Sequence, residues 1–159
     1  MSERSEQQSV IKVREALARL GAQGEVRALD DSARTAAEAA AALGIEVGQI
    51  ANSLIFDADG DPLLVLTSGA HRVDTGKVAA GLGAGKLKRA TPDFVREHTG
   101  QAIGGVAPLG HPKAVRTLVD TALEQYEVIW AAGGVPRAVF PITYAELLRV
   151  TAGTPTDVA

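Results

Sequence analysis

The stretch NSLIFDADGDPLLVLT, residues 52–67, contains two apolar runs separated by a short polar segment. The runs at 52–56 and 63–67 have the length and the aliphatic content of strands, and residues 58–61 between them predict a hairpin with a turn of four to five residues. Both runs are almost continuously apolar, as in strands that are covered on both faces. We therefore expect a hairpin buried on both faces.

Helical patterns lie on both sides of this hairpin. Val10, Val13 and Leu17 fall on one face of a helix predicted over 9–20. Thr35 and Glu38 form a capping-box pattern at the start of a second helix. Similar signals predict helices at 74–82, 91–100 and 143–150, short strands at 86–89, 115–119, 127–131 and 138–140, and a frayed tail from Thr151.

Length and element order bound the fold class. With 159 residues, of which 46% are hydrophobic, the chain is expected to form a single domain, 1–159, around one core. Strands interleaved with helices, joined by hairpin-length loops as well as crossovers, indicate a mixed sheet or a small barrel. The residues predicted to be buried in strands or apolar runs are Val65, Leu66, Ile103, Val119 and Ile129.

Composition excludes several classes of site and protein. The chain has no cysteine, which rules out disulfides and thiolate metal sites, and its three histidines lack metal-ligand spacing, so no metal is expected. A net charge of -3 argues against a protein that coats long nucleic acid. The polar start and the lack of a long apolar run favour a cytoplasmic protein without a membrane segment. The 4% aromatic content predicts a small substrate pocket.

Two patterns typical of nucleotide-binding proteins and of serine hydrolases are incomplete in this sequence. The glycine-rich segment 81–86 follows a predicted helix, whereas a dinucleotide loop follows a strand, and it lacks the spacing of a phosphate loop. The sequence also has no Gly-x-Ser-x-Gly elbow, so a serine hydrolase is not supported. A nucleotide-dependent enzyme is therefore the weakest of the functional alternatives.

The strongest local signal is the loop GGVAPLGH, residues 104–111. Glycines let backbone amides approach a ligand closely, and Pro108 restricts the loop, so amides here could point at a developing oxyanion. The alternative is a β-bulge or a tight crossover without chemistry. The spacing by itself favours neither interpretation.

Four ordered motifs carry a resemblance to a known family. The loop at 104–111, together with RTAAEAA at 34–40, QIANSLIF at 49–56 and GGVPR at 133–137, resembles the YbaK/EbsC family, also known as the YbaK/prolyl-tRNA-synthetase-associated editing domain. The resemblance covers about 35–150. It implies a mixed α+β fold with a mixed, largely antiparallel, barrel-like sheet flanked by helices.

The same resemblance implies a function. Family members are aminoacyl-tRNA deacylases that hydrolyse the ester of mischarged tRNA, commonly a proline tRNA, and need neither a metal nor an organic cofactor. The implied partner is the tRNA acceptor end, with a possible transient contact to a synthetase. Relatives are thought to rely on the terminal hydroxyl of the tRNA or on the substrate side chain more than on a protein nucleophile.

The resemblance also assigns site residues. Gly104 and Gly105 are the expected catalytic positions, through their backbone. One departure concerns Asn52, which stands where the family usually has lysine, so a non-catalytic binding module of the same fold is the alternative function. A local cationic patch formed by Arg72, Lys77, Lys86, Lys88 or Arg137 is expected near the pocket. The expected substrate-binding residues are Thr35, Asn52, Ser53, Ser68, Gly69, Arg72, Pro108, His111, Gly134 and Arg137.

Overall fold

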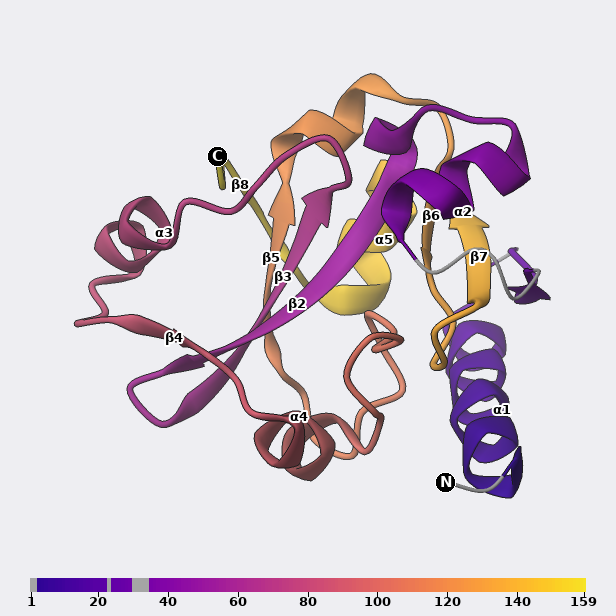
Figure 1. Ribbon diagram of the computed structural model, residues 1–159, viewed down its shortest axis with the longest axis horizontal. Helices are drawn as coiled ribbons and strands as arrows, with labels where there is room; N and C mark the ends of the chain where they lie inside the picture. The colour runs from indigo at the N-terminus through magenta and orange to yellow at the C-terminus, as the bar shows by residue number, and fades with distance from the viewer. Residues whose placement is uncertain (1–2, 23, 30–34) are drawn as a thin grey trace.

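The predicted hairpin forms the centre of the sheet. The computed structural model describes residues 3–22, 24–29 and 35–159 (Figure 1). Strand β2 (Ile50–Ala58) pairs antiparallel with β3 (Asp61–Ser68), and the ladder continues to the pair Ala58 and Asp61. The turn is therefore two residues long, shorter than the predicted four to five. Asp59 and Gly60 both have positive φ, at 53° and 96°, as a tight hairpin turn of the I′ type requires.

Alternate side chains of β3 enter different hydrophobic clusters. Leu64 and Leu66 pack into the larger cluster, which also contains residues of α1 (Glu3–Arg19), α4 (Pro92–Thr99) and α5 (Tyr144–Thr151). Leu63 and Val65 pack into a second cluster with residues of α3 (Thr75–Leu82). Because successive side chains of a strand point to opposite faces, these contacts confirm that the hairpin is buried on both faces.

The strands form one mixed sheet. Its order is β1 (Arg27–Ala28), β7 (Ala138–Ile142), β6 (Ile129–Ala132), β2, β3, β5 (Arg116–Asp120) and β8 (Thr154–Thr156), and β4 (Leu87–Arg89) also pairs with β2. Among the residues described, four strand pairs are antiparallel and three are parallel. The mixed α+β class, with helices flanking a mixed sheet, is confirmed.

The helix ends follow the caps in the sequence. Thr35 and Glu38 form the predicted capping box of α2 (Ala36–Leu43), and Thr91 and Thr143 cap α4 and α5 through their side chains. Two short 3-10 helices, η1 (Val47–Gln49) and η2 (Thr121–Gln125), were not predicted. Cap positions are predictable because each cap bonds to an amide only two or three residues away.

Three predictions about the ends and the core are wrong. The first helix starts at Glu3 and not at residue 9. The tail is not frayed, because β8 pairs with β5 and the side chain of Val158 is fully buried. Ile103 is 51% exposed because it lies in a loop and not in a strand, whereas the other predicted core residues, Val65, Leu66, Val119 and Ile129, are fully buried.

Candidate functional site

The sheet splits along one edge of β2. Strand β3 occupies the other edge along its whole length, whereas on this edge β6 pairs with Ile50 and Ala51 and β4 pairs with residues 56–58. In Figure 1, β4 accordingly lies near the hairpin end of β2 and β6 near its other end. Among the strand pairs of the described residues, this edge of β2 has no partner between Ala51 and Phe56. A strand edge left open inside a sheet offers polar backbone groups to a ligand.

A cavity of about 450 Å³ lies at this split. Its walls come from β2, from β4 and the residue after it, from α4 and the loop that follows it, from the end of β6 and from the segment that leads into α3. The lining residues are Asn52, Ser53, Leu54, Ile55, Phe56, Arg72, Val73, Thr75, Leu87, Arg89, Ala90, Val95, Ile103, Gly104, Val106 and Ala132. Most of these side chains are apolar, and the two arginines supply positive charge, so the cavity suits a small, partly apolar group attached to an anionic one.

Ser53 contributes uncommon polar groups to this wall. Its side-chain oxygen Oγ is buried and has no hydrogen-bond partner. The amide of Gly69, the residue after β3, donates to the carbonyl of Ile50 at 2.8 Å. Even-numbered residues of β2 therefore bond to β3, and the backbone of Ser53 points to the open edge. Buried polar groups are normally satisfied, so those left unpaired indicate a site.

The loop that follows α4 brings backbone to the cavity. Gly104 lines it with a φ of +96°, a conformation that favours glycine. A side chain on Gly105 would overlap the backbone of Val135 and Pro136, so glycine is required there for close packing of two loops. Within the described chain, the amides of Gly104, Gly105 and Val106 donate no hydrogen bond to another residue. Consecutive unpaired amides beside a cavity can stabilise negative charge on a ligand.

The rest of the predicted loop residues lie behind this wall. Pro108 is buried and does not line the cavity. The side chain of His111 is partly buried, and its Nε2 lies 2.8 Å from the carbonyl oxygen of Ala107. Burial lowers the pKa of His111, although the hydrogen bond to Ala107 raises it in part. The neutral imidazole therefore donates to this carbonyl near pH 7.

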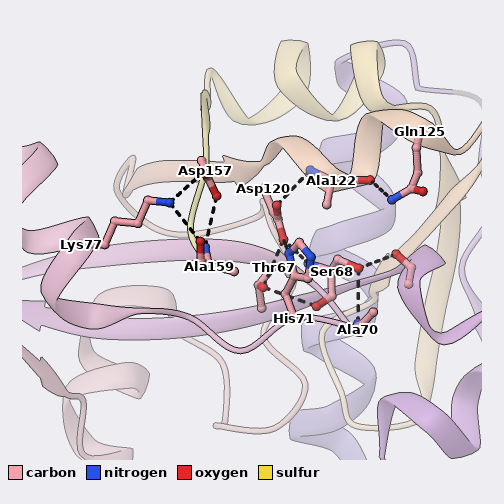
Figure 2. A network of polar contacts seen from close by, with 11 residues as sticks. Thr67, Ser68, Ala70, His71, Lys77, Asp120, Ala122, Gln125, Asp157 and Ala159 are labelled. Atoms are coloured by element: carbon pink, nitrogen blue, oxygen red, sulfur yellow. Dashed lines mark hydrogen bonds and ion pairs between the residues drawn. The ribbon is translucent and has the colours of Figure 1, made fainter.

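Other predicted site residues belong to a separate polar network (Figure 2). The hydroxyl of Ser68 donates to the carbonyl of Gly48 at 2.8 Å and accepts from the amide of Ala70. Asp120, which is 1% exposed, accepts from the amide of Ser68 at 3.0 Å and lies 2.9 Å from Nδ1 of His71. Gly69 packs against the carbonyl of Val47. These polar groups are satisfied within the protein.

The remaining predicted positions are distributed around the cavity or away from it. The hydroxyl of Thr35 is used to cap α2. Gly134 is buried, and Arg137 is exposed on the loop that packs against Gly105. The structure thus brings together Asn52, Ser53, Arg72 and Gly104 at the cavity, with Gly105 directly behind it.

The cationic surface at the cavity differs in part from the expected one. Arg72 lines the cavity as predicted, but Lys77 pairs with Asp157 at 2.7 Å. Sequence reasoning missed Arg89, which lines the cavity. The predicted basic strand 86–89 held a signal for it, because alternation places Lys88 and Arg89 on opposite faces.

No group of three or more acidic, histidine or cysteine side chains in the described part of the chain could hold a metal ion. No described helix has the length and apolar content needed to cross a membrane.

Comparison with known proteins identifies relatives over most of the chain. The family model described as an aminoacyl-tRNA editing domain matches residues 30–150. The uncharacterised protein YwhH of Bacillus subtilis is 29% identical over 126 residues, which cover 79% of this chain and 80% of YwhH. The proline–tRNA ligase of Nitratidesulfovibrio vulgaris is 31% identical over 134 residues, which cover 77% of this chain but only 23% of the ligase.

A solved structure is similar over nearly the whole length. It is described as a proposed trans-editing enzyme for prolyl tRNA synthetase, and it is 43% identical with a TM-score of 0.90. The match covers 99% of this chain and 98% of that chain. The similarity therefore includes the cavity, the 104–111 loop and the strands around them.

Proposed function

The chain belongs to the aminoacyl-tRNA editing domain family, and on this premise we propose that it is a deacylase for mischarged tRNA, with a proline tRNA as the preferred carrier. It would act in trans, on tRNA that a synthetase has already released or is about to release. The proposal places the protein in the cytoplasm, where aminoacyl-tRNA is made and used.

The observation that carries this proposal is the set of unpaired amides of Gly104, Gly105 and Val106 beside the cavity. Hydrolysis of an ester passes through a tetrahedral intermediate whose carbonyl oxygen becomes negative, and backbone amides stabilise such an oxyanion without reorganisation. The apolar lining suits the amino-acid side chain, and Arg72 and Arg89 suit the phosphate of the terminal nucleotide.

The reaction needs no protein nucleophile. A water molecule adds to the ester carbonyl carbon, the bond from that carbon to the ribose oxygen breaks, and the ribose oxygen takes up a proton as the amino acid leaves. The neighbouring hydroxyl of the terminal ribose is well placed by its own chemistry to orient the water. The protein contributes by binding the acyl group, orienting it and stabilising the oxyanion.

Asn52 supports a second candidate, a non-catalytic binding module for the tRNA acceptor end. Asn52 is exposed and lines the cavity, where the family usually has lysine, and its amide carries no charge. If the tRNA supplies the reactive hydroxyl, Asn52→Ala costs less activity than a change at Gly104, and Asn52→Lys raises activity by adding a positive charge.

Single-turnover deacylation at saturating enzyme, over a panel of mischarged tRNAs, tests the proposal. We expect release of at least one small amino acid from proline tRNA by the parent. Gly104→Ala, with its strained φ and its new methyl group at the amides, should lower that rate by about a hundredfold or more. Gly60→Ala is the matched control, because Gly60 has the same φ of +96° and equally open surroundings at the distant hairpin turn.

The two variants separate chemistry from strain. Both should lose similar stability in thermal melts, and only Gly104→Ala should lose activity. A parent that binds tRNA but releases no amino acid from any member of the panel would replace the deacylase with the binding module. A folded Gly104→Ala protein as active as the parent would remove the loop from the mechanism.

A further inference from the structure

The peptide of Ala107 is held from both sides by side chains outside the cavity. Its amide donates to Oε1 of Gln101 at 2.7 Å, and its carbonyl accepts from Nε2 of His111 at 2.8 Å. Gln101 is 2% exposed and Ala107 is fully buried. Hydrogen bonds in such a dry environment are strong and directional, so the orientation of this peptide is fixed.

Gln101 is itself anchored to the end of α4 and to the loop. Its Nε2 donates to the carbonyl of Leu109 at 3.4 Å, and its amide donates to Oγ1 of Thr99 at 3.1 Å. The same Thr99 hydroxyl lies 2.7 Å from the carbonyl of Val95, whose side chain lines the cavity. A continuous set of hydrogen bonds therefore joins the helix on one wall of the cavity to the loop on the next.

This arrangement divides the amides of the loop into two kinds. The amide of Ala107 is used by Gln101, whereas those of Gly104, Gly105 and Val106, directly before it, have no partner among the described residues. A peptide fixed at Ala107 limits how the preceding peptides can rotate, because the loop is also pinned where Gly105 packs on Val135 and Pro136.

We propose that Gln101 and His111 are positioning residues, which clamp the Ala107 peptide and so hold the three preceding amides toward the cavity. Neither touches the substrate. His111 thus has a different role from the substrate contact expected from the sequence, and Gln101 was not expected to have a role at all. This inference rests on the proposed function of the loop.

Glutamine suits this position because the clamp needs one acceptor and one donor on the same side chain. Oε1 accepts from Ala107 while Nε2 donates to Leu109. Methionine has a similar length and shape but makes neither bond, so Gln101→Met removes the clamp while the volume is nearly kept. Thr117→Val is the matched control. It removes a buried hydroxyl that donates to the carbonyl of Val115 at 2.8 Å. Thr117 lies in β5 and does not line the cavity.

The test combines three measurements on each folded variant. Gln101→Met should lower the single-turnover deacylation rate by about tenfold or more, since loss of a preorganised donor costs rate. Its affinity for uncharged tRNA should stay within about twofold of the parent, because Arg72 and Arg89 are unchanged. Hydrogen exchange of the Ala107 amide, followed by NMR, should become faster. Thr117→Val should change neither the rate nor this exchange.

The outcomes test the positioning role of Gln101 separately from the proposed deacylase function. If the parent deacylates and folded Gln101→Met is equally fast, the positioning role is wrong even when the Ala107 amide exchanges faster. If Gln101→Met lowers the tRNA affinity and the deacylation rate by similar factors, the substitution disrupts the whole site, and the positioning role is again wrong. A parent without deacylase activity overturns the proposed function, and the amide exchange then still reports whether the clamp exists.

Discussion

Two clusters of polar groups, the network around Asp120 and the groups at the cavity, differ in how their hydrogen bonds are used. In the network around Asp120, the carboxylate bonds to Ser68, His71 and the amide of Ala122, and each partner is satisfied within the protein. At the cavity, the hydroxyl of Ser53 and the amides at the start of the loop have no protein partner. A satisfied network rigidifies a fold, whereas unpaired groups at a cavity are available to a ligand.

This difference matters because each cluster contains a serine that was expected to bind substrate. Ser53 and Ser68 were both expected at the site, and sequence similarity does not separate their roles. The hydrogen bonds that each serine makes in the structure do separate their roles. The comparison predicts that changes in the network act on stability and that changes at the cavity act on binding or rate.

The largest expected effect is on the network. Asp120→Ala leaves the amides of Ser68 and Ala122 and the ring of His71 without their buried acceptor, and it should lower the free energy of unfolding by about 3 kcal/mol. Urea denaturation measures this loss. The single-turnover rate of the folded fraction, taken well below the melting temperature, should stay within about threefold of the parent. A much larger loss of rate would place the network in the site.

The two serines give the sharpest test of the comparison. Ser68→Ala removes two hydrogen bonds and leaves the buried carbonyl of Gly48 unpaired, so it should cost about 2 kcal/mol of stability. Ser53→Ala removes a buried hydroxyl without a partner and should be neutral or stabilising by up to about 1 kcal/mol. If urea denaturation shows that both variants lose the same stability, the distinction between the satisfied network and the unpaired groups at the cavity is wrong.

The arginines of the cavity should affect binding more than stability. Arg72→Gln and Arg89→Gln each remove a charge from the cavity lining, and each should weaken binding of tRNA by about tenfold at low salt. The difference from the parent should shrink as salt rises, because phosphate contacts release counterions. Lys77→Gln, which loses a pairing with Asp157 away from the cavity, is the control. If the affinity of the parent for tRNA does not change with salt concentration, tRNA is not the ligand.

The smallest expected effect concerns pH. Burial lowers the pKa of His111 in the folded protein, so the unfolded chain takes up a proton first as the pH falls through about 6.5. The stability that comes from keeping this ring neutral is therefore complete above that pH and is lost below it. His111→Gln keeps a donor for the Ala107 carbonyl but cannot titrate. Unfolding free energies measured from about pH 7.5 to about pH 5 should fall less steeply for this variant.

Local signals predicted much of the fold. The caps at Thr35, Thr91 and Thr143 and the continuous apolar run of β3, which indicated burial on both faces, depend on residues only a few positions apart, and they were predicted correctly. Strand β8 was missed because its partner β5 lies more than thirty residues earlier, and three residues with a proline have no strand pattern of their own.

The candidate site was predicted only in part, for a similar reason. The glycines of the loop are visible in the sequence because a positive φ or a close approach demands glycine, and Gly104 and Gly105 have these properties. Ile103 was expected in the core, although it is exposed at the cavity. Gln101 was overlooked, because an isolated glutamine has no pattern that marks it as buried.

The sequence by itself determined the family, the central hairpin, the helix caps and the loop at 104–111, since each depends on local chemistry or on an ordered set of motifs. Only the tertiary structure decided which polar groups are satisfied. The pairing of Ser68 with Gly48, the clamp of Gln101 on Ala107 and the unpaired edge at Ser53 all depend on segments brought together by the sheet. A hydrogen bond is set by distance and angle in space, and those are fixed only when the chain has folded.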